Sequence, residues 1–340
     1  MFPRDPHSIF SIPSNHPAVL QYQKIRPDLL KNLKLCGSFS LTLVLRGLYA
    51  SVSKPAIHII CENPSEFQQI STDLDYSLLK GKPTRLNLQD KKDLVFPGAS
   101  IGTNRKTGSF GGYLSDEQGV IYGLTSFHVL ASDASADIKD TPVYQPSPED
   151  SDVKKNMQKL STRNEDACIK VTDLFSQDEN LFGRCIGGKM NTCEDWALFK
   201  VIASRQAQNK VPILESYKGR FQEEIKSIAD PTEGSVVYKY GRTSGGKQGR
   251  INGVKADVSF DGQEPTAEWC VPSGYLGNFF ALEGDSGSWV INKFGAVIGH
   301  VFAGSKNQFD IYPLIYITPL KFILERIYST LNLKVHLLRN

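Results

Sequence analysis

The most constraining feature of this sequence is the pattern of residues 95 to 340, in which short apolar segments alternate with turns rich in glycine and aspartate. Turn signals of this kind, such as residues 115–119 and 292–295, are typical of hairpins. Many short strands joined by hairpins indicate a mainly β fold, as an antiparallel barrel or sandwich. The expected strands are residues 110–114, 120–125, 196–202, 236–240, 289–291 and 296–302.

Composition fits a globular chain of about two domains. Of the 340 residues, 40% are hydrophobic and 22% are charged, so the chain has enough apolar surface for a core and is not disordered throughout. The 39 Lys and Arg residues nearly balance the 36 Asp and Glu residues. The resulting net charge of +3 gives no electrostatic reason to expect nucleic acid as a partner.

Hydrophobic patterning predicts no membrane association. No apolar run reaches the length of about 18 residues that a transmembrane helix needs. The best apolar stretch, residues 41–50, is short and contains Arg46. The first residues, which include Pro3 and Pro6, have no apolar signal core, so a cytoplasmic location is the default expectation.

The six cysteines are expected to be reduced thiols, because they form no CxxC pair and no dense framework. Cys185 and Cys193 are spaced so that they could close a small loop, but the missing signal segment favours a reducing compartment. No histidine lies at ligand spacing from a cysteine pair. We therefore expect no metal site and no cofactor.

Residues 1–94 are expected to form a part of their own, followed by a second domain over residues 95–340. About the first 30 residues are rich in proline, serine and histidine and predict an irregular leader. Proline and glutamate just after Asn63 predict a helix that ends at about Lys80, where a Gly-Lys-Pro sequence follows. This helix completes a small α/β module with strands expected at residues 40–45, at 56–61 and near Leu86.

A regular apolar spacing near the C-terminus predicts an amphipathic helix from Pro319 to about Leu331. We expect its apolar stripe to pack on the barrel; the stripe consists of Leu320, Ile323, Leu324, Ile327 and Leu331. Residues 132–166, by contrast, are polar and charged with little periodicity. They predict a long surface insertion.

The sharpest local signal is Gly-Asp-Ser-Gly-Ser at residues 284–288, directly before an apolar strand. From average composition, a GDSG tetrapeptide is expected in fewer than about one chain in a hundred of this length. A serine on a tight, glycine-flanked bend presents its Oγ outward, and the N–H groups of Gly284 and Ser286 are then placed to hold a developing oxyanion. A plain polar β-turn is the alternative interpretation, since glycine, aspartate and serine are common in turns.

A serine nucleophile needs a base within hydrogen-bond reach, and His128 is the candidate. It follows the predicted strand at residues 121–125 and opens a short helical turn. The base in turn needs an orienting carboxylate. Asp195 stands at the head of an apolar strand, beside Glu194, which is expected to be a solvated strand start. Either residue alone is a common strand-end residue, but with Ser286 they follow the order His, Asp, Ser.

Taken together, these pieces resemble a chymotrypsin/trypsin-like serine peptidase. The matching sequences are TSFHVL around His128, EDWALFKV around Asp195 and GDSGSWV around Ser286. Further matches are KYGRTSGGKQGRINGV, AVIGHVFAG and the final IYITPLKFILERI. The resemblance covers about residues 95 to 340 and leaves out the module before them.

The resemblance implies two antiparallel six-stranded β-barrels, with an active site in the cleft between them. His128 would take the Ser286 proton and pass it to the leaving amine, while Asp195 would fix the tautomer and stabilise the imidazolium. The N–H groups of Gly284 and Ser286 would form the oxyanion hole. A protein or peptide substrate is therefore expected.

Substrate contacts are also implied by the resemblance. The strand from Phe302 to Gly304 would bind the substrate backbone by β-augmentation. The base of the main pocket lies six residues before the nucleophile in relatives, which here is Phe280. Because no carboxylate stands there to pair with a basic residue, we expect cleavage after an apolar residue, small or medium aliphatics above all.

The sequence departs at a few positions from the motifs of the secreted members of this family. Val129 and Leu282 stand where cysteines are usual, which matches the disulfide-free intracellular members. In secreted members the freed N-terminus pairs with the aspartate that matches Asp285. The family's mature N-terminal sequence has no clear copy here, and residues 97–102 occupy that place.

Other patterns in the sequence indicate structure rather than chemistry. Residues 241–248 nearly spell a phosphate-binding loop, but Gln248 replaces the hydroxyl residue and no helix follows, so a β-hairpin is expected. His58 and His300 are expected to lie against the core rather than in a cleft. An acyl hydrolase is excluded by motif and by residue order.

Two function classes remain. The first is an active serine endopeptidase that carries out limited, regulated proteolysis inside the cell, with the N-terminal module as a candidate site for a regulatory protein. The alternative is a non-enzymatic scaffold on the same fold. A scaffold is expected to lose triad residues, and all three are present here.

Overall fold

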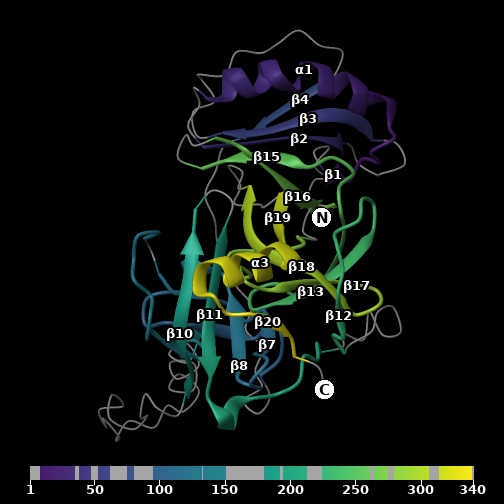
Figure 1. Ribbon diagram of the computed structural model, residues 1–340. Helices are drawn as coiled ribbons and strands as arrows, with labels where there is room; N and C mark the ends of the chain where they lie inside the picture. The colour runs from purple at the N-terminus through teal and green to yellow at the C-terminus, as the bar shows by residue number, and fades with distance from the viewer. Residues whose placement is uncertain are drawn as a thin grey trace, which may run out of the picture.

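The computed structural model contains two large, mainly antiparallel sheets and few helices, and the N-terminal residues lie at one end of the molecule (Figure 1). The sequence predicts a mainly β fold of two antiparallel six-stranded barrels with a C-terminal helix. The mainly β fold and the C-terminal helix are confirmed, and the two barrels are present as two curled sheets of 12 and 8 strands. The structure describes residues 8–34, 38–46, 53–61, 75–79, 95–131, 133–150, 180–191, 194–212, 224–260, 264–274, 279–305 and 314–338.

The first sheet runs in the order β20-β7-β8-β11-β10-β9-β5-β6, and all its pairings are antiparallel. Its interior is filled by a cluster of interlocking aromatic rings, among them Phe110, Phe182 and Phe199. The strands are β5 Ser100–Gly102, β6 Thr107–Ser109, β7 Gly112–Asp116, β8 Ile121–Thr125, β9 Pro142–Tyr144, β10 Leu181–Met190, β11 Asp195–Val201 and β20 Val335–Leu337.

The second sheet runs in the order β14-β13-β17-β18-β19-β16-β15-β2-β3-β4, with β1 and β12 attached at its sides. A core of aliphatic residues and Phe280 fills its curled part. Its strands from the second half of the chain are β12 Ser227–Ile228, β13 Val236–Gly241, β14 Gly245–Arg250, β15 Ala256–Ser259, β16 Thr266–Pro272, β17 Trp289–Asn292, β18 Ala296–Ser305 and β19 Leu314–Pro319.

The C-terminal helix is confirmed as α3, Leu320–Leu331. Of the predicted stripe, Leu320, Ile323 and Ile327 are fully buried against the sheets, as the spacing requires. The helix ends at Asn332, which adopts a left-handed backbone with φ of 49°. Arg326 on its other side pairs with Glu194, so Glu194 is a buried ion-pair partner of α3 and the expectation of a solvated strand start is wrong.

The expectation of an irregular leader is wrong for its second half, where α1 spans Pro17–Leu33. Pro17 suits the first helical position because its missing N–H needs no partner there. The His16 side chain caps the helix by accepting a hydrogen bond from the Ala18 N–H at 3.1 Å. The cap and the buried face, with Tyr22 and Leu29, override the proline-rich composition.

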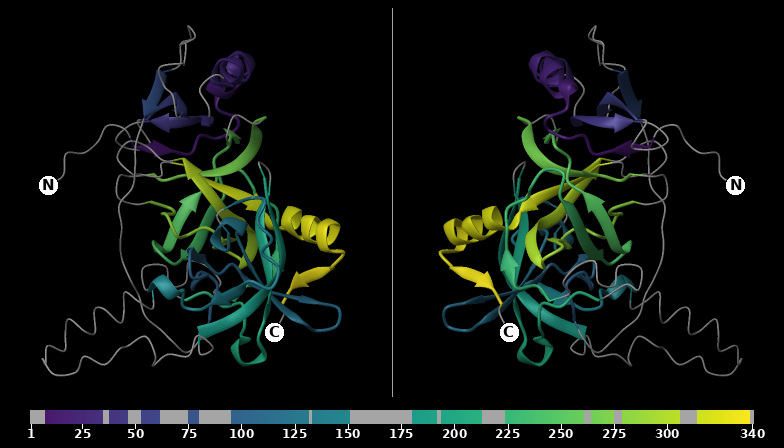
Figure 2. Two further views of the ribbon diagram at one scale, coloured as in Figure 1. Left: turned by 90° about the vertical axis from the view of Figure 1, so that its left-hand side faces the viewer. Right: turned by 90° about the vertical axis from the view of Figure 1, so that its right-hand side faces the viewer.

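The N-terminal strands extend the second sheet instead of forming a sheet of their own. They are β1 Ile9–Phe10, β2 Phe39–Arg46, β3 Lys54–Cys61 and β4 Asp75–Leu79. Strand β2 pairs antiparallel with β15, and Arg26 of α1 donates two hydrogen bonds to Asp257 of the same strand. Figures 1 and 2 show α1 and β2–β4 at one end of the molecule, with the first sheet at the other.

The last part of the predicted helix from Asn63 to Lys80 is a strand. Residues 75–79 form β4, which pairs parallel with β3, because the open edge of β3 offers them backbone hydrogen bonds that local propensity does not reveal. Residues 62–74 and the strand expected near Leu86 lie outside the described residues.

The predicted surface insertion is not wholly a surface feature. Residues 142–144 form β9, and Val143 and Ser147 are fully buried. Cys185 and Cys270 are free, buried thiols, and Cys61 is buried as well, whereas Cys193 lies outside the described residues. Among the helices that the structure describes, none is long and apolar enough to cross a membrane.

Candidate active site

The Gly-Asp-Ser-Gly-Ser sequence forms a tight turn between the core segment at Phe280 and strand β17. Gly284 and Gly287 adopt φ angles of 92° and 90°, a region that favours glycine. The N–H groups of Asp285 and Ser288 are used inside the turn, and that of Gly287 donates to the Val301 carbonyl at 2.7 Å. Among the described residues, the N–H groups of Gly284 and Ser286 donate to no protein acceptor.

This serine turn packs directly against the first sheet. The Ser109 N–H donates to the Ser286 carbonyl at 2.9 Å, and the Ser109 hydroxyl donates to the Gly284 carbonyl at 2.9 Å. A Cβ atom at Gly287 would lie 2.4 Å from the Ser109 carbonyl oxygen and 2.5 Å from Thr125 Oγ1. Glycine is therefore required for the turn to reach the end of β8.

His128 lies just beyond that end, in the 3₁₀ turn Phe127–Val129. Its Nδ1 atom is 2.5 Å from Oδ2 of Asp195, and its backbone N–H donates to Oδ1 of the same carboxylate at 3.2 Å. Asp195 begins β11, which pairs with β8, so the sheet register itself brings the two residues together. Both predicted positions, the helical turn and the strand head, are confirmed.

The electrostatics of the pair favour a proton on Nδ1. Burial works to lower the pKa of His128, but the Asp195 carboxylate outweighs it, and the pKa is raised above its ordinary value. Because an ionised carboxylate only accepts, Nδ1 carries the hydrogen and Nε2 of the neutral ring is left as the base. The His128 side chain is 38% exposed, so solvent and ligands can reach it.

The structure thus joins His128 to Asp195 and places the serine turn against the residues that precede His128. Within the described part of the chain, no hydrogen bond links the Ser286 hydroxyl to the His128 ring. In many hydrolytic sites this contact tightens only in the substrate complex. The geometry supplies a base, an orienting acid, a half-buried serine and two free N–H groups on one small surface.

Asp285, inside the serine turn, is completely buried and receives five hydrogen bonds. Lys239 of β13 donates from its Nζ at 2.7 Å, and Leu282 donates from its backbone at 2.9 Å. Thr243 donates from its N–H at 2.8 Å, and Ser244 donates from its N–H at 3.1 Å and its hydroxyl at 2.5 Å. Burial works to raise the pKa of Asp285, but Lys239 and these donors lower it, so the carboxylate is ionised.

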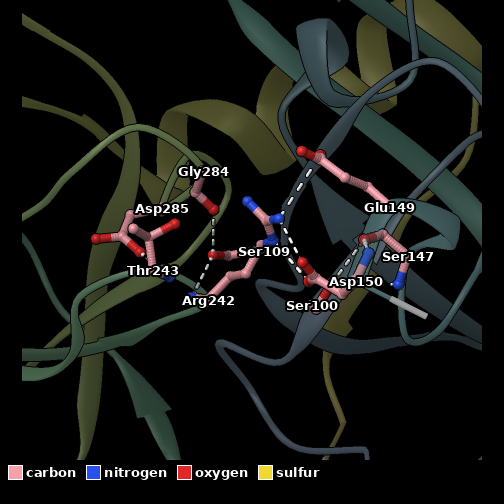
Figure 3. Close-up of polar contacts among 9 residues, drawn as sticks. All are labelled: Ser100, Ser109, Ser147, Glu149, Asp150, Arg242, Thr243, Gly284 and Asp285. Carbon is pink, nitrogen blue, oxygen red and sulfur yellow. Dashed lines mark hydrogen bonds and ion pairs between the residues drawn. The ribbon is translucent and has the colours of Figure 1, made fainter. Parts of the chain in front are cut away.

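A second ion pair spans the two sheets beside the serine turn (Figure 3). Arg242, in the β13–β14 turn, donates through Nε to Asp150 at 2.7 Å and through Nη2 at 2.5 Å. Its backbone N–H donates to the Ser109 hydroxyl, which in turn bonds Gly284. Asp150 also accepts a hydrogen bond from Ser100 of β5 at 2.5 Å. This network holds the first sheet, the hairpin turn and the serine turn together.

The predicted substrate-binding strand has one unpaired edge. Pairing of β18 with β17 ends at His300, whereas pairing with β19 continues to Ser305. Within the described residues, no strand covers the other edge of residues 302–305. The Phe302 side chain packs into the core next to Phe260 and Tyr316, so this residue offers its backbone only.

Phe280 is 1% exposed and belongs to the core cluster of the second sheet, where its ring lies against Gly249. His58 and His300 are buried as expected, and burial lowers the pKa of each to about 4. Residues 241–248 form the β13–β14 hairpin, as predicted, rather than a phosphate-binding loop.

Sequence reasoning missed Lys239 and the Arg242–Asp150 pair. Lys239 carried a signal in retrospect, because a lone lysine stands in the otherwise apolar strand Val-Val-Tyr-Lys-Tyr. Arg242 belongs to the segment that resembles a phosphate-binding loop, and Asp150 to the segment that predicts a surface insertion, so neither pattern indicates an ion pair.

Comparisons with known proteins identify one peptidase family and several similar solved structures. The sequence profile of peptidase family S64 matches residues 136–336, more than half of the chain. Similar solved structures include a glutamic acid-specific serine protease described as using a histidine triad in substrate binding. It is 16% identical in sequence, the match covers 71% of this chain and 100% of that chain, and the TM-score is 0.46. Protease A of Thermobifida fusca is 13% identical, with 71% and 98% covered and a TM-score of 0.44.

A chymotrypsin of Cellulomonas bogoriensis is 16% identical, with 72% of this chain and 99% of that chain covered and a TM-score of 0.43. The profile match decides the family because it covers more than half of the chain, from residue 136 to residue 336 within β20. The chain therefore belongs to peptidase family S64 and is a serine endopeptidase with a trypsin-like fold, acting on protein or peptide substrates.

Proposed function

We propose that Ser286, His128 and Asp195 are the catalytic triad of this peptidase. The observation that carries the proposal is the Asp195 carboxylate bonded to both Nδ1 and the backbone N–H of His128, next to the serine turn. Ser286 Oγ attacks the scissile carbonyl carbon while Nε2 of His128 accepts its proton. His128 then gives that proton to the leaving amine, and water releases the acyl group from Ser286 by the same route in reverse.

The N–H groups of Gly284 and Ser286 are proposed to hold the negative oxygen that develops during attack. Their neighbours in the turn are engaged in protein hydrogen bonds, whereas these two are available. Donors fixed in place before the reaction stabilise an oxyanion at little reorganisation cost, which makes this contribution large in acyl transfer.

The substrate backbone is proposed to add as a strand to the unpaired edge of β18 at Phe302 and Gly304. Main-chain hydrogen bonds at this edge would hold the peptide in an extended form without regard to its sequence. Phe280 is proposed to close the base of the main pocket, which limits the residue before the cut to small or medium aliphatic side chains.

We further propose limited, regulated proteolysis in the cytoplasm. Support comes from the free, buried thiols of Cys185 and Cys270, which suit a reducing compartment. The division at residues 94 and 95 into an N-terminal module and a peptidase domain remains a proposal, as does the binding of a regulatory protein by that module. The exposed Leu20 of α1, at 67% exposure, is a starting point for such a contact.

Active-site labelling tests the function and separates it from the alternative of a non-enzymatic scaffold. The full chain is incubated with a fluorophosphonate probe, which phosphonylates an activated serine, and the labelled peptide is identified by mass spectrometry. We expect label on Ser286, and none in the Ser286→Ala or His128→Ala variants. An unlabelled, folded wild-type chain would favour the scaffold.

A further inference from the structure

The feature that the mechanism above does not use is a completely buried lysine below the serine turn. Lys239 shares a strand face with Val237, which is also fully buried, and pairs in register with Val290 of β17. The exposed fractions of the Lys239 and Asp285 side chains are both 0%. An apolar residue would fill this position without the desolvation cost of an ammonium group.

The contacts of Lys239 converge on the turn. Its Nζ donates to Asp285 at 2.7 Å and to the Ser244 hydroxyl at 2.5 Å, and Ser244 itself donates to Asp285. Asp285 is the residue between Gly284 and Ser286. Anchoring its carboxylate therefore fixes the peptide plane that carries the Ser286 N–H. It also constrains Gly284, whose N–H belongs to the next peptide plane back along the chain.

We propose that Lys239 is a positioning residue for the serine turn. Its ammonium group neutralises the buried Asp285 carboxylate and so fixes the conformation of the turn. The turn is therefore formed in the uncut chain and needs no newly released N-terminus as counter-charge. This inference rests on the proposed function for its effect on catalysis, but its structural part stands by itself. Among the described residues, the donors to the Asp285 carboxylate belong to the β13–β14 hairpin, apart from Leu282, which lies directly before the serine turn.

The same network holds the serine turn from two sides. Thr243 and Ser244 hold Asp285 from the hairpin side, while Arg242, one residue earlier, lies beside Gly284 and reaches Asp150 of the first-sheet side (Figure 3). Among the described residues that donate to Asp285, Lys239 is the only charged one. Removing its ammonium group therefore leaves the buried Asp285 carboxylate without a charged partner. The carboxylate must then recruit water or move, and the turn moves with it.

Hydrogen exchange on the full chain tests the structural part directly. In Lys239→Met, we expect amide exchange in residues 281–288 to accelerate at least about tenfold, because local opening becomes easier. Exchange in residues 195–201 of the first sheet should not change. The matched control is Arg26→Met, which removes the partner of another buried carboxylate, Asp257, far from the serine turn.

Kinetics on a peptide substrate test the effect on catalysis. We expect kcat of Lys239→Met to fall about 100-fold with little change in KM, since misplaced oxyanion donors act on the transition state. Arg26→Met should retain kcat. If Lys239→Met does not fold, the double variant Lys239→Met with Asp285→Asn removes both charges and keeps the volume.

The double variant also separates positioning from stability. It should regain thermal stability but not the protection of residues 281–288 or kcat, because the carboxamide has one acceptor oxygen for donors that surround a carboxylate. Unchanged exchange in a folded Lys239→Met variant, or full recovery of kcat in the double variant, would overturn the proposal. A wild-type chain that takes no fluorophosphonate would instead overturn the proposed function, while the exchange result would still decide the role of Lys239.

Discussion

Nδ1 of His128 lies 2.5 Å from Oδ2 of Asp195, and the backbone N–H of His128 lies 3.2 Å from the other oxygen of that carboxylate. One carboxylate therefore fixes both the ring and the main chain that carries it. The arrangement leaves Nε2 as the only ring nitrogen that can accept a proton.

This pair predicts the pH dependence of the reaction. Protonated His128 cannot act as a base, so activity should rise with pH, and the raised pKa puts the midpoint above the ordinary histidine value of 6.5. Asp195→Asn should move the midpoint down, since it removes the group that raises the pKa, and should lower kcat by about four orders of magnitude. A pH profile of kcat/KM measures both effects, and a variant with near-normal activity would remove Asp195 from the mechanism.

Ser286→Ala and His128→Ala should each abolish detectable cleavage and leave the fold intact, because each removes a side chain at the surface of the site. The double variant should be hardly slower than either single variant, since the groups act as one unit. Single-turnover rates and circular dichroism check the two statements. Clearly additive losses would argue against a shared step.

Gly287→Ala should destroy activity by displacing the serine turn. Its φ of 90° is unfavourable for alanine, and the added Cβ would lie 2.4 Å from the Ser109 carbonyl oxygen. The matched control is Gly119→Ala, where φ is 79° but no atom lies within 4 Å. We expect a loss of kcat of at least about 100-fold for the first variant and about 1 kcal/mol or more of stability for both, with activity kept in the control.

Arg242→Gln and Asp150→Asn should each lower the free energy of unfolding by about 1–3 kcal/mol, because each leaves a half-buried charge without its partner. The double variant should lose less than the sum of the two. Since Arg242 also holds Ser109 and lies beside Gly284, we expect kcat to fall about tenfold in Arg242→Gln. Denaturant titration gives the coupling energy, and strictly additive losses would show that the pair does not couple the sheets.

Peptide libraries varied at the residue before the cut should show a preference for small or medium aliphatic side chains, because Phe280 is proposed to fill the base of the pocket. Phe280→Ala should shift the preference toward aromatic side chains by enlarging that space. A dominant preference for Arg or Lys in the wild-type chain would contradict the assignment of Phe280 and direct attention to Glu283.

The sequence by itself determined the local elements of the fold and the identity of the candidate catalytic residues. Some features are set by residues that are close together in the sequence, so a local pattern predicts them. They include the glycines around Ser286, the first residues of strands and the apolar stripe of α3. Short strands and hairpin turns predicted an antiparallel barrel or sandwich, and the resemblance to trypsin-like peptidases implied two barrels. The triad hypothesis needed only residue types at strand ends and their order.

Only the tertiary structure decided which distant groups meet. Lys239 reaches Asp285 across 46 residues and Arg242 reaches Asp150 across 92, because strand pairing puts the β13–β14 hairpin beneath the serine turn. Pairing with β3 made a strand of residues 75–79, where local propensity favoured a helix. Backbone hydrogen bonds at an open sheet edge and the burial of opposite charges depend on register, and register is a property of the folded chain, not of a local sequence pattern.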